Sequence, residues 1–291
     1  MKVLLIGSDP VDFTLAFVNG LARQASTVAV LPRARYLPLA GWIDPAADLR
    51  LVDWPRHRSL ANLALLARLT RLVARERPDV VHVLSNTTLW LNAAVPLWRR
   101  VPLVTTVHDV MPHPGDHDTA RLPDWSSSLM ARQSGDIVVH GEGLQKAAMA
   151  RFGKGAANVH VLQHPAIARY AELARREGMV RTSPADRFTV LLFGRIFAYK
   201  GLDTLVQAEA LLRDRLPGLR IVIAGRGDDP RSLGPALADP ARYDVRYGFV
   251  EDRDVAQLLL DADLVALPYS EASQSGVLHL ASTFAKPVVV T

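Results

Sequence analysis

The feature that most constrains the fold is a regular alternation, along the whole chain, between short aliphatic runs and helix-length segments. Such runs are typical of buried strands, and helix-length connections between them favour parallel sheets covered by helices. Two series of strands are predicted. The first series comprises residues 3–6, 27–31, 49–52, 80–84, 103–107, 137–140 and 159–162, and the second comprises 189–193, 220–224, 245–247, 264–267 and 288–290. Helices are expected between most of them, for example over 59–75 and 143–152.

The two series predict an α/β protein with two doubly wound, Rossmann-like domains that face a cleft. A chain of 291 residues is long enough for two domains that each bury a core. We expect an N-terminal domain over residues 1–165, a linker over 166–187 and a C-terminal domain over 188–291. The sequence ends in KPVVVT, within a predicted strand, so we expect the second domain to be truncated and the chain to be a fragment.

Composition excludes several classes of protein. The chain contains no cysteine, which excludes a disulfide scaffold, thiolate metal sites and a cysteine nucleophile, and agrees with a reducing cytoplasm. The first ten residues, MKVLLIGSDP, hold one lysine and five apolar residues, so they predict a strand and not a signal peptide. No run reaches the roughly 18 apolar residues of a membrane-spanning helix. A cytoplasmic protein is therefore expected.

The charge is unevenly distributed along the chain. Residues 1–165 carry 18 Lys and Arg against 13 Asp and Glu, whereas residues 166–291 carry 16 of each. The formal charge of +5 thus belongs to the first half, which we expect to face an anionic partner that is not a nucleic acid. In residues 56–77, six arginines bracket an apolar helical face. This segment predicts either a crossover helix with a solvated basic edge or a peripheral docking surface for anionic lipid at the inner face of the membrane.

The clearest chemistry lies in FTVLLFGRIFAYKGLDTLVQA, residues 188–208. An apolar strand leads into Gly194-Arg195, and Lys200-Gly201 opens an amphipathic helix. Two cations therefore follow the carboxyl end of a strand, where an open α/β sheet keeps its ligand crevice. A guanidinium can bind two phosphate oxygens at once and an ammonium adds a point charge, while glycines allow close backbone approach. The alternative is a pair of surface cations beside a turn.

Four segments together resemble the donor domain of the GT-B glycosyltransferases, in particular retaining family 4, the glycosyl transferases group 1. They are FGRIFAYKGLDTLVQA (193–208), IVIAGRGDD (221–229), YGFVEDRDVAQLLLDADLVALPY (247–269) and EASQSGVLHLASTFAKPVVVT (271–291). The first half is similar more loosely, through residues 78–83, 102–116 and 135–146. The resemblance implies a nucleotide-diphosphate-sugar donor, a hydroxyl acceptor (a sugar, a lipid-linked or a small molecule) and retention of anomeric configuration, in polysaccharide or glycolipid biosynthesis. It also implies that no cofactor and no bound metal are needed.

The resemblance assigns the phosphate contacts to two stretches of the second half. Arg195 and Lys200 would hold the diphosphate and stabilise its charge as the sugar leaves, with Gly194 beside them. Residues Ser275, Gly276 and Val277 would form a first helical turn whose N–H groups favour the same anion. An ordinary helix N-cap is the alternative for the serine.

The resemblance also implies contacts to the sugar and to the base. Glu271 would lie near the donor sugar, unless it is a solvated loop carboxylate. Base contacts would come from Gly225, Arg226, Tyr247, Phe249 and Val250. Core packing is the alternative for the two aromatic rings.

The chain departs from the family at the ribose site. The family places a second glutamate eight residues after the first, for the ribose hydroxyls. Eight residues after Glu271 stands His279, and six residues before Lys286, where the second glutamate is otherwise expected, stands Leu280. The ribose carboxylate is therefore missing, which leaves ribose recognition open.

In the first half, HDVMPHPGDHD (108–118) follows a predicted strand. By resemblance, His108 would orient an acceptor hydroxyl or take its proton, and a loop histidine with satisfied hydrogen bonds is the alternative. A metal cluster of His108, Asp109, His113, Asp116, His117 and Asp118 is disfavoured, because the prolines that alternate with the histidines do not favour a helix that would present an i, i+4 pair of ligands. Gly7, Ser8 and His140 are carried over as acceptor or sugar contacts.

Two further functions remain open. One is a catalytically inactive module that binds nucleoside diphosphates, which the missing glutamate and the abrupt end would fit. The other is a sugar-nucleotide epimerase of the same fold, which the GRxxxxKG pattern disfavours. The Asp-Ala-Asp of residues 261–263 resembles a metal-binding pair of a different glycosyltransferase fold, but its helix-to-strand position predicts a capping role.

Overall fold

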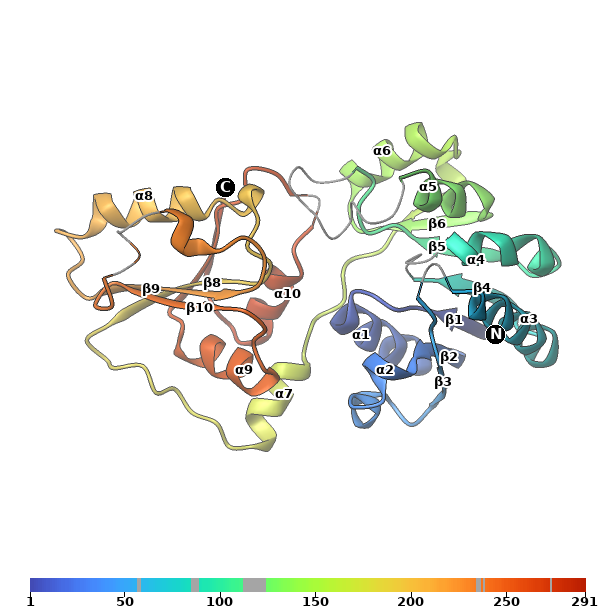
Figure 1. Cartoon of the computed structure of the whole chain (residues 1–291), viewed down its shortest axis with the longest axis horizontal. Helices are drawn as coiled ribbons and strands as arrows, with labels where there is room; N and C mark the ends of the chain where they lie inside the picture. Colours follow the sequence, from blue (N-terminus) through green and yellow to red (C-terminus); the bar gives the residue numbers. More distant parts are fainter. Residues whose placement is uncertain (57–58, 85–88, 112–123, 234–236, 238, 273) are drawn as a thin grey trace. The chain divides into compact units, whose positions relative to one another are not determined.

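The computed structural model describes residues 1–56, 59–84, 89–111, 124–233, 237, 239–272 and 274–291. Contacts between residues divide the chain into two compact units that meet in the sequence between Pro165 and Ala166. Each unit contains one parallel sheet with helices on both faces (Figure 1). The predicted α/β class with two doubly wound sheets is therefore confirmed.

The first unit is built on a parallel sheet in the order β3-β2-β1-β4-β5-β6-β7. Its strands are β1 (Lys2–Ile6), β2 (Ser26–Pro32), β3 (Ala47–Val52), β4 (Val80–Val83), β5 (Leu103–Thr106), β6 (Asp136–Val139) and β7 (Val159–Val161). The chain reverses its direction of travel across the sheet between β1 and β4. In open α/β sheets such a switch point marks where ligands bind, outside the carboxyl ends of the strands.

Alternating side chains of these strands pack into two separate hydrophobic cores, one on each face of the sheet. Leu4 and Ile6 point into one cluster, and Leu5 between them points into the other, as expected for a strand that is buried on both faces. The helices of the unit are α1 (Val11–Ala22), α2 (Arg33–Tyr36), α3 (Ala61–Glu76), α4 (Leu89–Ala94), α5 (Asp124–Gln133) and α6 (Glu142–Phe152). Short 3₁₀ turns are η1 (Ala40–Trp42), η2 (Val95–Trp98) and η4 (Ala156–Asn158).

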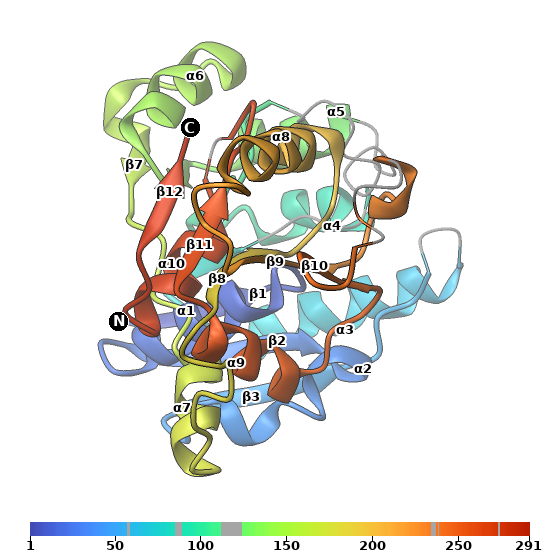
Figure 2. The same ribbon diagram turned by 90° about the vertical axis from the view of Figure 1, so that its left-hand side faces the viewer.

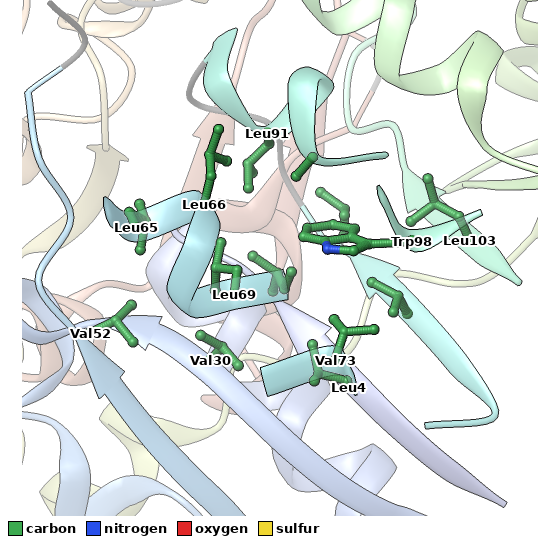
Figure 3. Packing of buried hydrophobic residues seen from close by; sticks show 14 of the residues in the cluster. Leu4, Val30, Val52, Leu65, Leu66, Leu69, Val73, Leu91, Trp98 and Leu103 are labelled. Atoms are coloured by element: carbon green, nitrogen blue, oxygen red, sulfur yellow. The ribbon is translucent and has the colours of Figure 1, made fainter. Parts of the chain in front are cut away.

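Helix α3 shows how the sequence pattern produces this packing. Leu65, Leu66, Leu69 and Val73 recur at helical spacing and are buried, so one stripe of the helix faces the sheet (Figure 3). Full burial of such a side chain contributes about 1.5–3 kcal/mol. The helix ends at Arg77, whose φ of 45° is left-handed, directly before a proline that cannot continue it.

The second unit repeats the plan with five strands in the order β10-β9-β8-β11-β12, and its switch point lies between β8 and β11. The strands are β8 (Phe188–Phe193), β9 (Leu219–Gly225), β10 (Tyr243–Tyr247), β11 (Leu264–Leu267) and β12 (Val288–Val290). Helix α8 (Leu202–Leu212) covers one face, and α7 (Arg169–Arg176), α9 (Asp252–Asp261) and α10 (Gly276–Thr283) cover the other (Figure 2). The described part of the unit also contains the 3₁₀ turns η5 (Ala198–Lys200) and η6 (Pro230–Leu233).

The segment 166–187, expected as a linker, contributes a packed helix to the second unit. Tyr170 and Ala174 of α7 are buried in the same cluster as α9, and Arg169 forms a bidentate ion pair with Asp252. The two apolar residues are spaced i, i+4, but the surrounding charges conceal this short stripe in the sequence.

All predicted strands are present, and their ends differ from the prediction by at most two residues. Within the described residues, no helix combines the length and the apolar character that a membrane crossing requires.

Candidate functional site

The loops that follow β8 and β9 are joined to each other by backbone hydrogen bonds. The N–H of Ile196 donates to the carbonyl of Arg226 at 2.7 Å, and the N–H of Asp228 donates back to Ile196 at 2.7 Å. Beyond β10, the N–H of Gly248 donates to Gly225 at 2.8 Å. Backbone hydrogen bonds between neighbouring chain segments thus continue past the ends of the strands. They connect the loops at the carboxyl edge of the sheet to one another.

Two glycines make this close approach possible. Gly201 has φ +67°, and a Cβ there would lie 1.7 Å from the carbonyl oxygen of Pro268. Gly225 has φ +146°, and a Cβ there would lie 1.7 Å from the carbonyl oxygen of Gly194. Only glycine fits both the conformation and the space. The loop after β8 is thereby locked against β9 on one side and against the loop after β11 on the other.

Arg195 and Lys200 are half-buried, and both lie against aromatic rings. The Arg195 guanidinium carbon lies 5.5 Å from the ring centre of Phe197. The Lys200 ammonium lies 3.7 Å from the ring centre of Tyr269 and 4.8 Å from that of Tyr199. Burial raises the pKa of Tyr269, while the hydrogen bond to Ser275 and the positive charge of Arg195 act in the opposite direction. Both cations therefore lie around Tyr269, at the switch point of the sheet.

The first turn of α10 adjoins the same loop. A Cβ on Gly194 would lie 3.4 Å from Cγ2 of Val277, so the glycine and the helix start are in contact. Ser275 is the N-cap residue, but its side chain makes no capping hydrogen bond and lies instead 3.3 Å from the Tyr269 hydroxyl. Gly276 begins the helix, whose first N–H groups have no partner within the helix. Gly194, Lys200, Ser275 and Val277 are thus brought together.

Glu271 is exposed, two residues beyond Tyr269. Neither position considered for the ribose carboxylate offers an acid. Leu280 is buried in the core of the second unit, and His279 is half-buried, with a pKa lowered by burial. The missing carboxylate is therefore not replaced by another acid at these two helical positions.

The residues predicted to contact a nucleobase line the ends of β9 and β10. Arg226 is exposed, and the Tyr247 hydroxyl donates to the carbonyl of Gly227 at 2.8 Å. Tyr247 is 44% exposed and Phe249 is 77% exposed, so core packing does not account for either ring. Val250 does pack against the core of the second unit.

In the first unit, three histidines surround the ring of Phe13. His108, His140 and His164 follow β5, β6 and β7, and their rings lie 4.6, 5.0 and 5.1 Å from that of Phe13, all edge-on. The rings of His108 and His140 stack at 5.2 Å. The sequence pointed to His108 and His140 but not to His164 and Phe13. A signal for His164 was its place shortly after a strand, whereas Phe13 read as one more apolar residue of a helix.

Each of the three imidazoles is oriented by a backbone carbonyl. His108 Nε2 donates to Leu84 at 3.1 Å, His140 Nδ1 to Leu162 at 3.0 Å, and His164 Nδ1 to Pro165 at 2.8 Å. Burial lowers the pKa of His108 to about 3, and the charges of His140 and His164 act in the same direction, against that of Asp109. At neutral pH His108 is therefore an uncharged imidazole with its proton on Nε2.

The N-terminal loop contributes unequally to this cluster. A Cβ on Gly7 would lie 3.4 Å from Leu84, the residue whose carbonyl orients His108. Ser8 is buried, and its carbonyl accepts a hydrogen bond from the Tyr36 hydroxyl at 3.0 Å. His140 thus contacts His108 directly and Gly7 lies against Leu84, whereas the Tyr36 hydroxyl of α2 binds the carbonyl of Ser8.

The suggested metal ligands are only partly covered by the structure. His113, Asp116, His117 and Asp118 lie outside the described residues. Within the part of the chain that is described, no three His, Asp or Glu side chains are arranged to hold a metal ion.

The two aspartates of residues 261–263 have structural partners. Asp261 accepts hydrogen bonds from the N–H groups of Thr182 at 2.6 Å and Ser183 at 2.9 Å, and Asp263 pairs with Arg181 at 2.5 Å. These contacts anchor the segment before β8. Asp263 also lines a cavity of about 500 Å³ at the amino end of β8, opposite the edge that carries Arg195 and Lys200.

Comparison with known proteins identifies two family models that together cover most of the chain. Residues 11–165 match the model of a glycosyl transferase 4-like domain, and residues 187–291 match that of glycosyl transferases group 1. A glycogen synthase of Mycobacterium tuberculosis is 29% identical over 237 residues, which are 74% of this chain and 52% of the relative. The chain thus spans about half the length of that relative. A D-inositol 3-phosphate glycosyltransferase of Corynebacterium glutamicum is 24% identical over 95% of this chain and 73% of its own.

A third relative matches over a shorter stretch of the chain. A GDP-mannose:glycolipid 4-beta-D-mannosyltransferase of Xanthomonas campestris is 35% identical over 101 residues, 34% of this chain and 29% of its own. Among solved structures, Anabaena HepE in complex with UDP and glucose has a TM-score of 0.65 at 19% identity, covering 100% of this chain and 80% of its own. The UDP-GlcNAc 2-epimerase of Neisseria meningitidis, bound to UDP-GlcNAc, has a TM-score of 0.64 at 15% identity, covering 100% and 82%. These structures show the GT-B fold.

Proposed function

The chain belongs to the glycosyltransferase family of these two domain models, and on that premise we propose that it transfers a sugar from a nucleotide-diphosphate sugar to a hydroxyl acceptor. We further propose that the transfer retains the anomeric configuration. The observation that carries the proposal is the position of Arg195 and Lys200 around Tyr269 at the switch point between β8 and β11. A nucleotide-sugar donor is supported by the name of the mannosyltransferase relative and by the UDP and UDP-glucose in HepE structures.

The proposed chemistry of the second unit is stabilisation of the leaving diphosphate. Negative charge develops on the diphosphate as the sugar departs, and the guanidinium of Arg195 and the ammonium of Lys200 stand where a strand end and a helix start meet. The first N–H groups of α10 add donors for the same anion. Removing one preorganised donor of this kind costs about 2.7–4 kcal/mol of transition-state stabilisation.

The first unit is proposed to bind the acceptor next to His108. With a pKa of about 3, this imidazole is too weak a base to take a hydroxyl proton at neutral pH. An uncharged imidazole can instead orient the acceptor hydroxyl through a hydrogen bond. The departing phosphate oxygen then takes the proton, which fits attack from the face that the leaving group vacates. Gly7, Ser8 and His140 are proposed as neighbours of the acceptor.

Specificity is proposed to come from the exposed residues of the second unit. Tyr247 and Phe249 would hold the base, together with Gly225, Arg226 and Val250. Glu271 would bind hydroxyls of the donor sugar, and the ribose is proposed to be held without a carboxylate from α10. No cofactor and no metal ion is proposed for the reaction.

A partner at the membrane surface is also proposed. Helix α3 exposes Arg68, Arg71 and Arg75, and the exposed side chains of Leu60 (77%) and Leu63 (55%) adjoin its start. The neighbouring turn η2 exposes Leu97 (64%), followed by the exposed Arg99 and Arg100. Basic side chains beside exposed leucines suit an anionic bilayer. Docking there would bring the protein to an acceptor that is linked to lipid.

Vesicle co-sedimentation tests the membrane partner. The wild type should bind vesicles that contain phosphatidylglycerol and not vesicles of phosphatidylcholine alone. Arg68→Glu/Arg71→Glu should abolish this binding, whereas Arg215→Glu/Lys146→Glu, an equal charge change at exposed positions elsewhere, should largely keep it. Equal sedimentation of both double variants would refute the assignment.

Turnover tests the proposed function itself. The protein is incubated with a panel of UDP- and GDP-sugars and sugar acceptors, and products are followed by mass spectrometry. Transfer releases the nucleoside diphosphate and yields a glycoside, and Arg195→Ala or Lys200→Ala should slow it by 10²–10³-fold, unlike Arg215→Ala. A new sugar nucleotide without released diphosphate would indicate an epimerase. Binding without any product would indicate an inactive module.

A further inference from the structure

The loops that follow β8 and β11 meet across the switch point of the second sheet. The N–H of Ser270 donates to the carbonyl of Tyr199 at 2.9 Å, and the Ser270 hydroxyl lies 3.3 Å from the same oxygen. The backbone of Gly201 approaches Pro268 so closely that a Cβ would not fit. These contacts fix η5, which carries Lys200, directly against the loop that carries Tyr269.

The ammonium of Lys200 lies over two aromatic faces. Its Nζ atom is 3.7 Å from the ring centre of Tyr269 and 4.8 Å from that of Tyr199, and the two rings are edge-to-face at 6.5 Å. Both rings are buried. A cation is attracted to a ring face by the quadrupole of the ring, and unlike a carboxylate this partner does not cancel the charge. The arrangement therefore orients an ammonium group.

The other end of Tyr269 reaches the start of α10. Its hydroxyl lies 3.3 Å from the Ser275 hydroxyl, and either group can donate. One side chain thus touches Lys200 through its ring and the N-cap residue of α10 through its oxygen.

We propose that Tyr269 is a positioning residue that presets the Lys200 ammonium for the diphosphate across the switch point between β8 and β11. The identity of the anion rests on the proposed function above, whereas the role of the ring does not. Because Tyr269 also packs in the core of the second unit, the test must separate orientation of the ammonium from a general loss of packing.

Nuclear magnetic resonance tests the contact without any ligand. The chain has five lysines, so protein labelled with ¹³C at lysine Cε gives few signals, and Lys200→Met assigns the one of interest. Protons above a ring face are shifted upfield, so the Cε protons of Lys200 should lie upfield of the other four. Tyr269→Phe should keep most of this shift and Tyr269→Leu should lose most of it. An unshifted Lys200 signal in the wild type would overturn the proposal.

Calorimetric titration with UDP tests the consequence. Tyr269→Leu should weaken binding about tenfold, equivalent to ~1.4 kcal/mol and within the range of desolvated cation–π contacts. Tyr269→Phe should weaken it less than about threefold, because the ring remains. In a Lys200→Met background, Tyr269→Leu should cause almost no further loss, since the ring then has no ammonium to orient. All variants are titrated at a temperature at which thermal unfolding shows them to be folded.

The outcomes distinguish this proposal from the proposed function. An equal loss from Tyr269→Leu with and without Lys200 would mean that the ring acts through packing, and the positioning role would be wrong. If UDP affinity depends on Lys200 but not on Tyr269, the positioning role of Tyr269 is wrong, and the proposed function is unaffected. UDP binding unaffected by Lys200→Met would refute the diphosphate role of Lys200, and with it the purpose assigned to Tyr269.

Discussion

At the scale of single residues, the environment of a charge or a proton determines what a side chain can do. Arg195 and Lys200 lie against aromatic rings, which suits them to meet an anion that arrives from outside. His108 is held neutral by burial and by neighbouring imidazoles, which suits it to orient a hydroxyl and not to remove its proton. The two cations of the second unit and the histidine of the first unit thus have separate proposed roles.

Replacement of His108 tests the orienting role. His108→Ala should lower kcat/KM for transfer by roughly tenfold, which is less than the 10²–10⁴-fold that a general base typically supplies. The shape of the pH–rate profile between pH 5.5 and 8 should be the same in both proteins, because His108 does not titrate in that range. An acidic limb near pH 6.5 that disappears in the variant would show that His108 acts as a base.

A buried histidine of the first unit predicts an acid-sensitive stability. His82 lies in the core of the first unit with Nε2 2.9 Å from the Thr106 hydroxyl, and burial lowers its pKa to about 4. Below pH 6.5 the unfolded chain takes up a proton that the folded chain refuses, so the free energy of unfolding should fall from pH 6.5 to 4 and then level off. The contribution is about 3 kcal/mol. Urea unfolding should show this slope, and His82→Gln should reduce it; an unchanged slope would contradict the assignment.

At the scale of elements, the sequence predicts strands well and tertiary clusters poorly. The strands were predictable because each is a short aliphatic run between polar segments, and parallel strands are buried on both faces. The proposed phosphate-binding residues could be singled out in the sequence because Arg195 and Lys200 lie in one linear motif after such a run. The cluster of three histidines around Phe13 could not be predicted from the sequence. It forms where one helix packs against the ends of three strands, and no local sequence pattern indicates such a tertiary contact. The packing of helix α7 was not predicted, because its buried stripe consists of two residues, which is too short to stand out in the sequence.

The glycines that join the loops give a prediction at this scale. Gly201 and Gly178 have similar left-handed backbones, with φ of +67° and +61°, but only Gly201 abuts another backbone. Gly178→Ala should therefore cost only the conformational strain of about 1–2 kcal/mol. Gly201→Ala should cost clearly more and should also weaken UDP binding, because Pro268 must move. Equal destabilisation of the two variants in urea would contradict the close approach of these loops.

At the scale of the whole molecule, charge and chemistry are divided between the units. The first half carries the entire formal charge of +5, and the second half is neutral overall although it holds Arg195 and Lys200. This division fits a basic unit that meets an anionic surface and a second unit that uses a few placed cations for one diphosphate. Each proposed site lies at the carboxyl edge of its sheet, as expected for doubly wound sheets.

The proposed reaction predicts independence from metal ions. Transfer measured after treatment with EDTA and gel filtration should equal that of the untreated protein, and added Mg²⁺ or Mn²⁺ should not raise it, because Arg195, Lys200 and the N–H groups of α10 supply the positive charge. Loss of transfer on chelation, with recovery on addition of a divalent ion, would show that a metal takes part.

The affinity for UDP tests the central claim most directly. Titration calorimetry compares the wild type with Arg195→Ala, Lys200→Ala and the exposed control Arg215→Ala. Hydrogen bonds to charged groups contribute about 1.5–3 kcal/mol, so each of the first two changes should raise the dissociation constant roughly tenfold to a hundredfold, and the control should leave it unchanged. Equal affinity in all four proteins would contradict the assignment of Arg195 and Lys200 to the diphosphate.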